Sequence, residues 1–423
     1  MMKILVISQP AWSNENNSGN TLSNVFKGFD AEFANIYFSE GLPNNDICKL
    51  YFQVTDYQIL QHFLKRKPVG RAVAKLDAVE SSGEAFESSA KKHKNAFLLL
   101  MRELLWKITK IETDEMMQFV RQFNPDVIYA PSYGNLHMQR IVRQLHEKTS
   151  LPIVSLISDD LYNYHNEDKS LFGWINKTML RNSIHRTFSI YSLIYTMTDE
   201  QRIEYEGIFH VPMKIMRKNS AVIYKTHSFK SPYRMIYAGG LYLGRLKTIE
   251  MIAEEISKMN SDKSTIIFDI YSNTALTSEE RTRLQTNNGV SMHSSVPYDE
   301  LIQKYWESDI ALHAESFESR YSDYTRLSFS TKIVDCLQSG AAVLAVGPEN
   351  NSGIAYLERE KAAICCTDAN DIGSSMKALI DDLPYWQRQA ELCIQRNHDP
   401  AVNKQQMELD FHNVINSSKR SAQ

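Results

Sequence analysis

The feature that most constrains the fold of this 423-residue chain is an alternation of short apolar runs with longer helical patterns. The runs are rich in β-branched residues and apolar on both faces, which is typical of parallel strands covered by helices on both sides. We therefore predict an α/β protein built from βαβ units. The predicted strands are 3–8, 33–39, 126–131, 152–158 and 192–197, followed by 233–239, 265–272, 309–316 and 341–347.

Two parallel sheets fit this number of strands better than one very wide sheet. The segment 219–232 has no sustained helical period and contains Ser, Pro and Asn before a fresh strand begins. We place the domain boundary there. The prediction is a first domain over 1–222, a second over 223–395, and a C-terminal helix and tail over 396–423.

Charge and cysteine usage exclude several classes of protein. Lys and Arg total 47 against 50 Asp and Glu, which argues against a dedicated nucleic-acid binder. The five cysteines form no CxxC pair, which argues against a disulfide framework or a zinc site. The apolar run at 3–8 is too short for a signal peptide, and no run is long enough to span a membrane. We expect a cytoplasmic protein.

One segment departs from the alternation of predicted strands and helices. Residues 61–110 hold eleven Lys or Arg against five acidic residues, and 91–110 carries an apolar side beside a basic flank. Such a basic amphipathic helix can lie on an anionic membrane surface. Alternatively, its apolar face packs on its own domain while its lysines meet water. The apolar side comprises Phe97, Leu98, Leu104, Leu105 and Ile108.

Three segments follow predicted strands and carry residues suited to binding an anion. The first is the loop at 8–29, where Gly19 and Asn20 stand at the turn into a predicted helix. Backbone N–H groups there can hold an anion or a sugar hydroxyl, and glycine permits close approach. The spacing is not that of a dinucleotide-binding GxGxxG motif, and an ordinary strand-to-helix turn remains an alternative.

The second segment, 237–258, runs from a predicted strand through Gly239 and Gly240 toward a predicted helix. Arg245 and Lys247 stand just before that helix. Arginine can engage phosphate oxygens in a bidentate fork, and lysine adds a compact charge. Together they would hold a diphosphate without a metal ion. The alternative is a pair of ordinary surface cations.

The third segment, 308–350, is the most specific. We predict that its helix has Ser330 as N-cap and Gly340 as C-cap. Lys332 and Asp335 are three residues apart and so project from the same side of the first turn. They could receive a phosphate and an adjacent ribose diol, or form an ordinary surface ion pair.

These segments resemble one known family. TKIVDCLQSGAAVLAVGP (331–348) is similar to the donor-site helix of retaining nucleotide-sugar glycosyltransferases with the GT-B fold, of the glycosyltransferase family 4 (group 1) type. YAGGLYLGRLKTIE (237–250) resembles the start of that family's C-terminal domain. PDVIYAPSYGN (125–135) and ISDDLYNY (157–164) resemble segments that line its N-terminal domain.

The resemblance implies two Rossmann-like parallel-sheet domains that face each other across a cleft. The N-terminal domain would bind the acceptor and the C-terminal domain a nucleoside-diphosphate sugar. Asp335 occupies the place of the family's ribose-binding acid, which is usually Glu. Leu327 stands where the family has a second Glu, and Glu315 at the end of the preceding strand is the candidate substitute.

The same resemblance assigns the cations. Arg245 and Lys247 match the pair that neutralises the diphosphate, and Lys332 supports the same charge. The implied catalytic residues are Glu315, Arg245 and Lys332. No metal ion or other cofactor is expected, because fixed cations can stabilise the leaving diphosphate. The implied donor-binding residues are Gly19, Gly240, Arg245, Lys247, His313, Ser330, Thr331, Lys332 and Asp335.

The acceptor is less defined. Asp159 and Asp160 follow a predicted strand and could bind an acceptor hydroxyl or cap the next helix. Segment 91–110 suits a lipid-linked saccharide at the inner face of the cytoplasmic membrane, although a soluble acceptor remains open. We expect a retaining glycosyltransferase of bacterial surface polysaccharide biosynthesis. The alternatives are a non-catalytic GT-B partner protein, which the missing Glu at Leu327 favours, and a nucleotide-sugar 2-epimerase.

Overall fold

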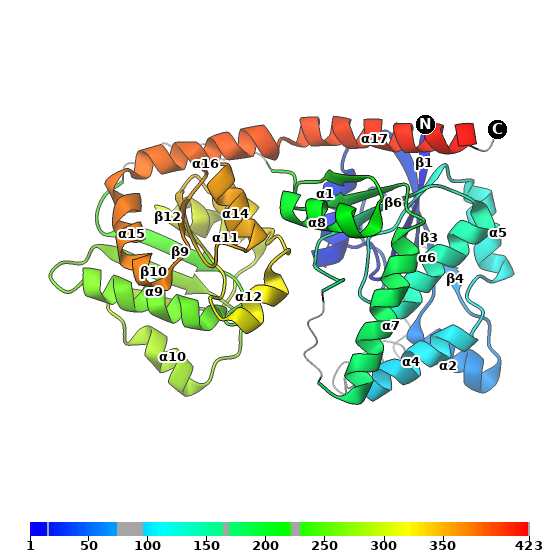
Figure 1. Cartoon of the computed structure of the whole chain (residues 1–423), viewed down its shortest axis with the longest axis horizontal. Coiled ribbons are helices and arrows are strands. Elements are labelled where there is room, and N and C mark those ends of the chain that lie inside the picture. Colours follow the sequence, from blue (N-terminus) through cyan, green and yellow to red (C-terminus); the bar gives the residue numbers. More distant parts are fainter. Residues whose placement is uncertain (15–16, 74–95, 164–168, 221–228, 422–423) are drawn as a thin grey trace. The chain divides into compact units, whose positions relative to one another are not determined.

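The computed structural model describes residues 1–14, 17–73, 96–163, 169–220 and 229–421 (Figure 1). Its contacts divide the chain into two compact units. Unit 1 comprises Met1–Met197, Arg202–Met216 and Ala401–Gln423, and unit 2 comprises Thr198–Gln201 and Arg217–Pro400. Each unit has its own sheet, so the predicted α/β class with two parallel-sheet domains is confirmed. The predicted boundary at residue 222 lies outside the described residues.

Unit 1 is built on an eight-stranded sheet with the order β4-β3-β2-β1-β5-β6-β7-β8. All neighbouring strands are parallel except β3 and β4, which are antiparallel. The antiparallel edge corrects the expectation of a purely parallel sheet. The strands are β1 (Met2–Ser8), β2 (Ala31–Tyr37), β3 (Leu50–Gln53), β4 (Arg71–Val73), β5 (Val127–Tyr129), β6 (Ile153–Ile157), β7 (Leu193–Thr196) and β8 (Met213–Ile215).

The central strands of this sheet are buried on both faces, as the apolar runs predict. Ile4 and Leu5 are successive residues of β1, so they point to opposite faces, and both are fully buried. All five residues of β6 are buried as well. The helices of the unit are α1 (Asn17–Phe26), α2 (Asp56–Lys65), α4 (Ala96–Ile108), α5 (Asp114–Phe123), α6 (Leu136–Thr149), α7 (Leu171–Phe188), α8 (Asp199–Phe209) and α17 (Pro400–Ser421).

Unit 2 is built on a six-stranded, fully parallel sheet with the order β11-β10-β9-β12-β13-β14. This is a doubly wound arrangement in which the strand order reverses between β9 and β12. The strands are β9 (Tyr233–Ala238), β10 (Ile266–Tyr271), β11 (Val290–His293), β12 (Ile310–Ala314), β13 (Ala342–Val346) and β14 (Ile364–Cys366).

Helices connect these parallel strands, as a parallel sheet requires. Apolar side chains of α9, including Ile249, Ile252 and Ile256, are fully buried in the core formed with the sheet. The helices are α9 (Arg245–Met259), α10 (Ser278–Gln285), α11 (Tyr298–Trp306), α12 (Ser319–Thr325), α13 (Lys332–Gln338), α14 (Ser352–Arg359), α15 (Ile372–Asp381) and α16 (Leu383–Asn397).

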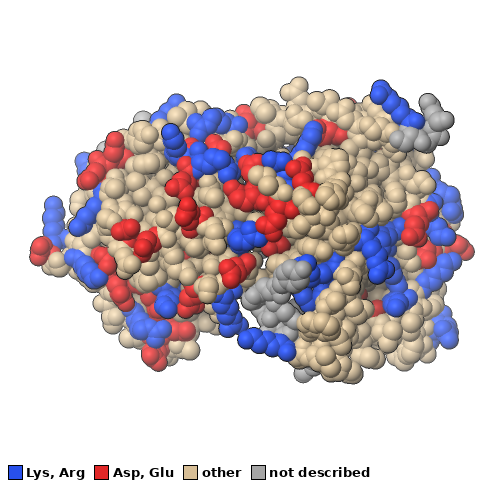
Figure 2. All heavy atoms as spheres, viewed as in Figure 1, with Lys and Arg blue, Asp and Glu red and all other residues tan. Residues whose placement is uncertain are grey.

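Five short strands escaped prediction: β3, β4, β8, β11 and β14. Each has three or four residues, too few to display the period of two that identifies a strand. The nine predicted strands are all present. Among the described residues, no helix is both long and apolar enough to cross a lipid bilayer. Acidic and basic side chains are interspersed over the visible face (Figure 2).

The last helix, α17, packs on unit 1. Phe411 is fully buried, with its ring centroid 6.0 Å from that of Phe29 and 6.2 Å from that of Tyr129. The neighbouring Asp410 accepts a hydrogen bond from the Tyr195 hydroxyl at 2.9 Å and pairs with Lys214. A helix from the chain's end therefore completes the core of the first sheet.

This packing makes a testable prediction for stability. Phe411→Ala should lower the free energy of unfolding by about 3–5 kcal/mol, because it leaves a cavity among buried aromatic rings. Urea denaturation followed by circular dichroism measures the change. Leu409→Ala is the matched control, since Leu409 is 54% exposed on the same helix and should change stability little. Equal losses in both variants would contradict this account of α17.

Candidate functional site

The candidate site of unit 2 lies where the strand order reverses. Strands β9 and β12 are neighbours there, with Met235 paired to Ile310. Ligands of doubly wound sheets bind outside the carboxyl ends of the strands at such a point. Gly239 and Gly240 directly follow β9, and Glu315 directly follows β12. The second and third segments singled out in the sequence thus meet at one position of the sheet.

An ion pair between Arg245 and Glu315 occupies this position. Arg245 Nε donates to Glu315 Oε2 at 3.1 Å, and Nη2 donates to Oε1 at 2.9 Å. The two side chains are only 14% and 5% exposed. Burial is the largest single influence and lowers the pKa of Arg245, but Glu315, together with Tyr237 and Tyr242, raises it, and the net direction is upward. The guanidinium is therefore permanently charged and held in a fixed orientation.

The backbone around the pair is also fixed. Glu315 N donates to Val346 O at 2.8 Å, and the Thr248 hydroxyl donates to Glu315 O at 2.9 Å. Gly244, just before α9, has a φ of 75°, a left-handed conformation that glycine adopts without strain. A side chain on Gly244 would also collide with Ser316 and Tyr321.

Lys332 reaches the same place from the start of α13. A Cβ on Gly239 would lie 2.5 Å from Lys332 Nζ, so the glycine leaves room for the ammonium group. Burial and the nearby Arg245 lower the pKa of Lys332. In the described part of the chain, no carboxylate forms an ion pair with Lys332. The cluster of Arg245, Glu315 and Lys332 therefore carries one positive charge in excess.

His313, the fourth residue of β12, is buried beside this cluster. Burial, Arg245 and Lys332 lower its pKa to about 3, so the imidazole is neutral near pH 7. Its Nε2 lies 3.7 Å from Glu315 Oε1, too far for a hydrogen bond, and has no other partner among the described residues. This Nε2 is therefore a buried ring nitrogen that no hydrogen bond satisfies in the described part of the chain.

The neutral state of His313 makes a prediction for stability against pH. Between pH 6.5 and 3 the unfolded chain binds a proton on this residue and the folded protein does not, so stability falls as the pH is lowered through this window. His313→Gln should reduce the slope of unfolding free energy against pH by about 1.4 kcal/mol per pH unit near pH 5. Urea denaturation at a series of pH values measures it. An unchanged slope would show that His313 is not buried neutral.

Other residues predicted for this site have their own partners. Lys247 Nζ lies 3.3 Å from Glu318 Oε1 and is exposed. Asp335 pairs with Lys218 at 2.7 Å. It does not pair with Lys332, although the three-residue spacing would allow that pair. Leu327, at the position of the family's second Glu, is a buried apolar residue.

The predicted start of the donor helix needs a correction. The N-cap of α13 is Thr331, not Ser330, and it makes no side-chain capping bond. Thr331 has helical backbone angles, φ −60° and ψ −16°, and the Ser330 carbonyl already accepts from Ile333 N. The first turn is therefore closed by this backbone bond and not by a side-chain cap. The C-cap is Ser339, not Gly340, and Gly340 follows it with a φ of 73°.

The two predicted glycines have local packing roles. Gly19 lies inside α1 and not in the loop before it, which corrects the prediction. A Cβ there would lie 2.2 Å from the Ser13 carbonyl oxygen, so close packing within unit 1 accounts for the glycine. The ring of Tyr242 lies against Gly240, whose carbonyl accepts from the Tyr237 hydroxyl at 2.8 Å.

The predicted acceptor residues differ from each other. Asp159 is exposed after β6. Asp160 is buried, and its Oδ1 accepts from the Tyr205 hydroxyl at 2.6 Å. Asp160 therefore supports the fold of unit 1, whereas Asp159 is exposed as a residue but has a carboxyl group whose pKa is raised by desolvation.

The sequence reasoning missed Lys218, which holds Asp335 and also donates to the Thr331 carbonyl at 3.4 Å. Lys218 stands 117 residues before Asp335, outside any of the segments singled out. It also passed over Gly239 in favour of Gly240. The contact of Gly239 with Lys332 is visible only in the fold.

Solved structures with a similar fold include proteins in complex with nucleotides or sugars. They include Anabaena HepE in complex with UDP-glucose (14% identity, 99% of this chain and 100% of that chain, TM-score 0.61). The pneumococcal O-GlcNAc transferase GtfA in complex with UDP and GlcNAc matches with 11% identity over 98% and 99% of the two chains, at a TM-score of 0.60. An α,α-trehalose-phosphate synthase from Burkholderia xenovorans, in complex with glucose-6-phosphate, matches with 10% identity over 97% and 100%, at 0.54.

These likenesses support the predicted GT-B fold class. No protein-family model matches the sequence, and a search of curated proteins found no match. At identities of 14% or less, the likeness concerns the fold alone.

Proposed function

We propose that this protein is a retaining glycosyltransferase of the family 4 type that transfers a sugar from a nucleoside diphosphate to a saccharide acceptor. One observation carries the proposal: Lys332, whose Nζ lies against Gly239, and Arg245 interact electrostatically at the point where the strand order of unit 2 reverses. A diphosphate is the ligand that best fits two fixed cations at this edge of a doubly wound sheet.

In this proposal the cations act on the leaving group. Negative charge develops on the diphosphate as the bond to the sugar breaks, and preorganised cations stabilise it. Arg245 and Lys332 supply that charge without a metal ion. Glu315 acts through Arg245, because both of its carboxylate oxygens engage the guanidinium.

The remaining residues would bind the rest of the donor. Asp335, held by Lys218, would accept hydrogen bonds from the ribose hydroxyls. His313 would offer its unpaired Nε2 to the donor sugar. Lys247 would add a further positive charge near the diphosphate, and to do so it would give up its exposed ion pair with Glu318. Gly240, Ser330 and Thr331 would contribute backbone contacts beside the diphosphate.

The test is a thermal-shift screen with UDP-, GDP-, dTDP- and CDP-sugars. A ligand that binds the folded state at about 100 times its Kd stabilises it by about 2.7 kcal/mol, which raises the midpoint. We expect one nucleotide class to raise the midpoint of the wild type and neither Lys332→Ala nor Arg245→Ala to respond. The sugar chosen by the screen then serves in a transfer assay.

Lys258→Ala is the matched control, because Lys258 lies at the other end of α9, exposed and paired with Glu255. It should keep the full shift. If none of the four classes shifts the wild type, the donor-site proposal fails. If Lys258→Ala loses the shift as completely as Lys332→Ala, the effect comes from overall charge and the assignment of Lys332 fails.

A second candidate function, a non-catalytic GT-B partner protein, is favoured by the apolar Leu327 in place of the family's acid. The two candidates differ in turnover. A partner protein would bind the donor without releasing the nucleoside diphosphate in the presence of any acceptor. Release of nucleoside diphosphate, followed over time, distinguishes them.

We further propose a peripheral contact of unit 1 with a membrane, consistent with a lipid-linked acceptor. Part of the amphipathic segment, 91–95, lies outside the described residues. In α4, Trp106 is buried and donates to Asp56, whereas Phe97 and Ile108 are 51% and 58% exposed. The ring of Phe97 lies 5.5 Å from that of Phe172 on α7. Both alternatives for the segment thus have support: one face of α4 packs on unit 1, and another face is exposed.

Phe97→Ser combined with Trp174→Ser should weaken binding to vesicles of phosphatidylcholine and phosphatidylglycerol by about tenfold or more, because each exposed ring gives up apolar contact with the lipid. Co-sedimentation measures it. Leu409→Ser, at a comparably exposed position on α17, should bind as the wild type does. Unchanged binding of the double variant would contradict the membrane contact.

A further inference from the structure

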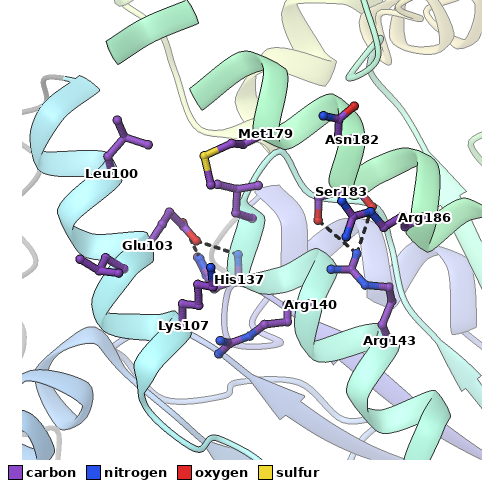
Figure 3. A pocket seen from close by; sticks show the side chains of 12 residues that line it. Leu100, Glu103, Lys107, His137, Arg140, Arg143, Met179, Asn182, Ser183 and Arg186 are labelled. Atoms are coloured by element: carbon purple, nitrogen blue, oxygen red, sulfur yellow. Dashed lines mark hydrogen bonds and ion pairs between the residues drawn. The ribbon is translucent and has the colours of Figure 1, made fainter. Parts of the chain in front are cut away.

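Unit 1 holds a cavity of about 440 Å³ between α4, α6 and α7 (Figure 3). Its volume lies in the range of small-molecule sites. The walls combine two chemistries: apolar side chains and four cations. The apolar residues are Leu100, Leu104, Leu136 and Met179, and the cations are Lys107, Arg140, Arg143 and Arg186.

The cations of the cavity are not neutralised by acids. Among the described residues, none of the four forms an ion pair with a carboxylate. Glu103, the one acid of the lining, already accepts from His137 N and pairs with His137 Nδ1, each at 2.8 Å. Burial, followed by the neighbouring Arg186, lowers the pKa of Arg143. The cavity thus keeps a positive charge that an anion would relieve.

Two buried polar atoms at the cavity also lack partners. His137 is 2% exposed, and its Nε2 has no hydrogen-bond partner in the described part of the chain. Nε of Arg140 is likewise unpaired, while the same guanidinium donates to the Trp106 carbonyl through Nη2. Leaving buried polar groups unpaired is unfavourable, so a ligand that pairs with them would be stabilised.

The apolar part of the lining continues onto the surface. Leu104 and Met179 line the cavity and are nevertheless 48% and 43% exposed. On the same two helices, Met101 of α4 and Leu171 and Trp174 of α7 are exposed as well. A ligand with only a charged group would leave this apolar surface uncovered. A ligand with both an anionic head and a hydrocarbon chain would cover it.

We propose that this cavity binds the phosphate of a phosphorylated lipid, with the hydrocarbon chain leaving over the exposed apolar residues of α4 and α7. Arg140, Arg143, Arg186 and Lys107 would surround the phosphate. Arg143 is positioned for this by Ser183, whose carbonyl and hydroxyl accept from Nη1 at 3.0 and 3.1 Å. The idea that this lipid carries the acceptor rests on the proposed function. The lipid binding itself does not depend on it.

Farnesyl phosphate, farnesol and inorganic phosphate are suitable probes for titration calorimetry. We expect the wild type to bind farnesyl phosphate more tightly than either of the others. Lys107→Gln combined with Arg186→Gln should weaken that binding about a hundredfold, at about tenfold for each lost charge-assisted bond. Both side chains are exposed and without hydrogen-bond partners among the described residues, so the double variant should fold normally.

Arg121→Gln is the matched control, since Arg121 is an exposed cation on α5 outside the cavity. It should bind farnesyl phosphate as the wild type does. Inorganic phosphate binding as tightly as farnesyl phosphate would identify a free-phosphate site and overturn the proposal. Equal binding of farnesol, or equal weakening by Arg121→Gln, would overturn it as well.

The thermal shift measured with a nucleotide sugar distinguishes failure of this inference from failure of the proposed function. The double variant should keep that shift in full, because its two positions lie in unit 1 and the donor residues in unit 2. If the wild type shows the thermal shift with a nucleotide sugar but does not bind farnesyl phosphate, the lipid proposal fails and the donor-site proposal stands. Farnesyl phosphate binding without any nucleotide-sugar shift would overturn the proposed function and keep the lipid site.

Discussion

The buried ion pair of Arg245 and Glu315 is the interaction on which the candidate donor site depends. A buried pair costs desolvation energy, and it is tolerated where its geometry is good and its surroundings are fixed. Here the pair is bidentate and the Glu315 backbone is held from two sides. It gives the guanidinium one orientation at the reversal of the sheet. It also leaves Lys332 as an uncompensated cation, and the positive surroundings contribute to keeping His313 neutral.

The sites of the two units share a surplus of positive charge and differ in their walls. In unit 2 the cations lie beside Gly239 and the polar residues that follow β12, which suits a ligand that is polar throughout. In unit 1 the cations lie among leucines and a methionine, and the apolar lining reaches the surface. Charge alone would not tell the two ligands apart. The surface that each ligand must cover does tell them apart, and for this reason we propose a sugar nucleotide for one unit and a phosphorylated lipid for the other.

The sequence predicts the features that depend on local pattern. Short apolar runs rich in β-branched residues identify the central strands, and the family resemblance places the residues after β9 and β12 in one donor site. Short edge strands such as β4 carry no period to detect, and the antiparallel direction of β4 follows from pairing with β3 alone. The partner of Asp335 is set by tertiary packing across 117 residues, which overrides the i,i+3 spacing to Lys332. The cavity was missed because its cations stand on three separate helices.

The state of Glu315 limits the chemistry it can perform. A carboxylate with both oxygens engaged by one guanidinium has little freedom to act as a nucleophile or a base, since either role requires breaking charge-assisted bonds. Its position after β12 therefore does not make it an equivalent of the acid missing at Leu327. The simpler role is to orient Arg245, and charge stabilisation then falls to Arg245 and Lys332. A reaction that proceeds at this site would depend on stabilising the departing diphosphate more than on any protein nucleophile.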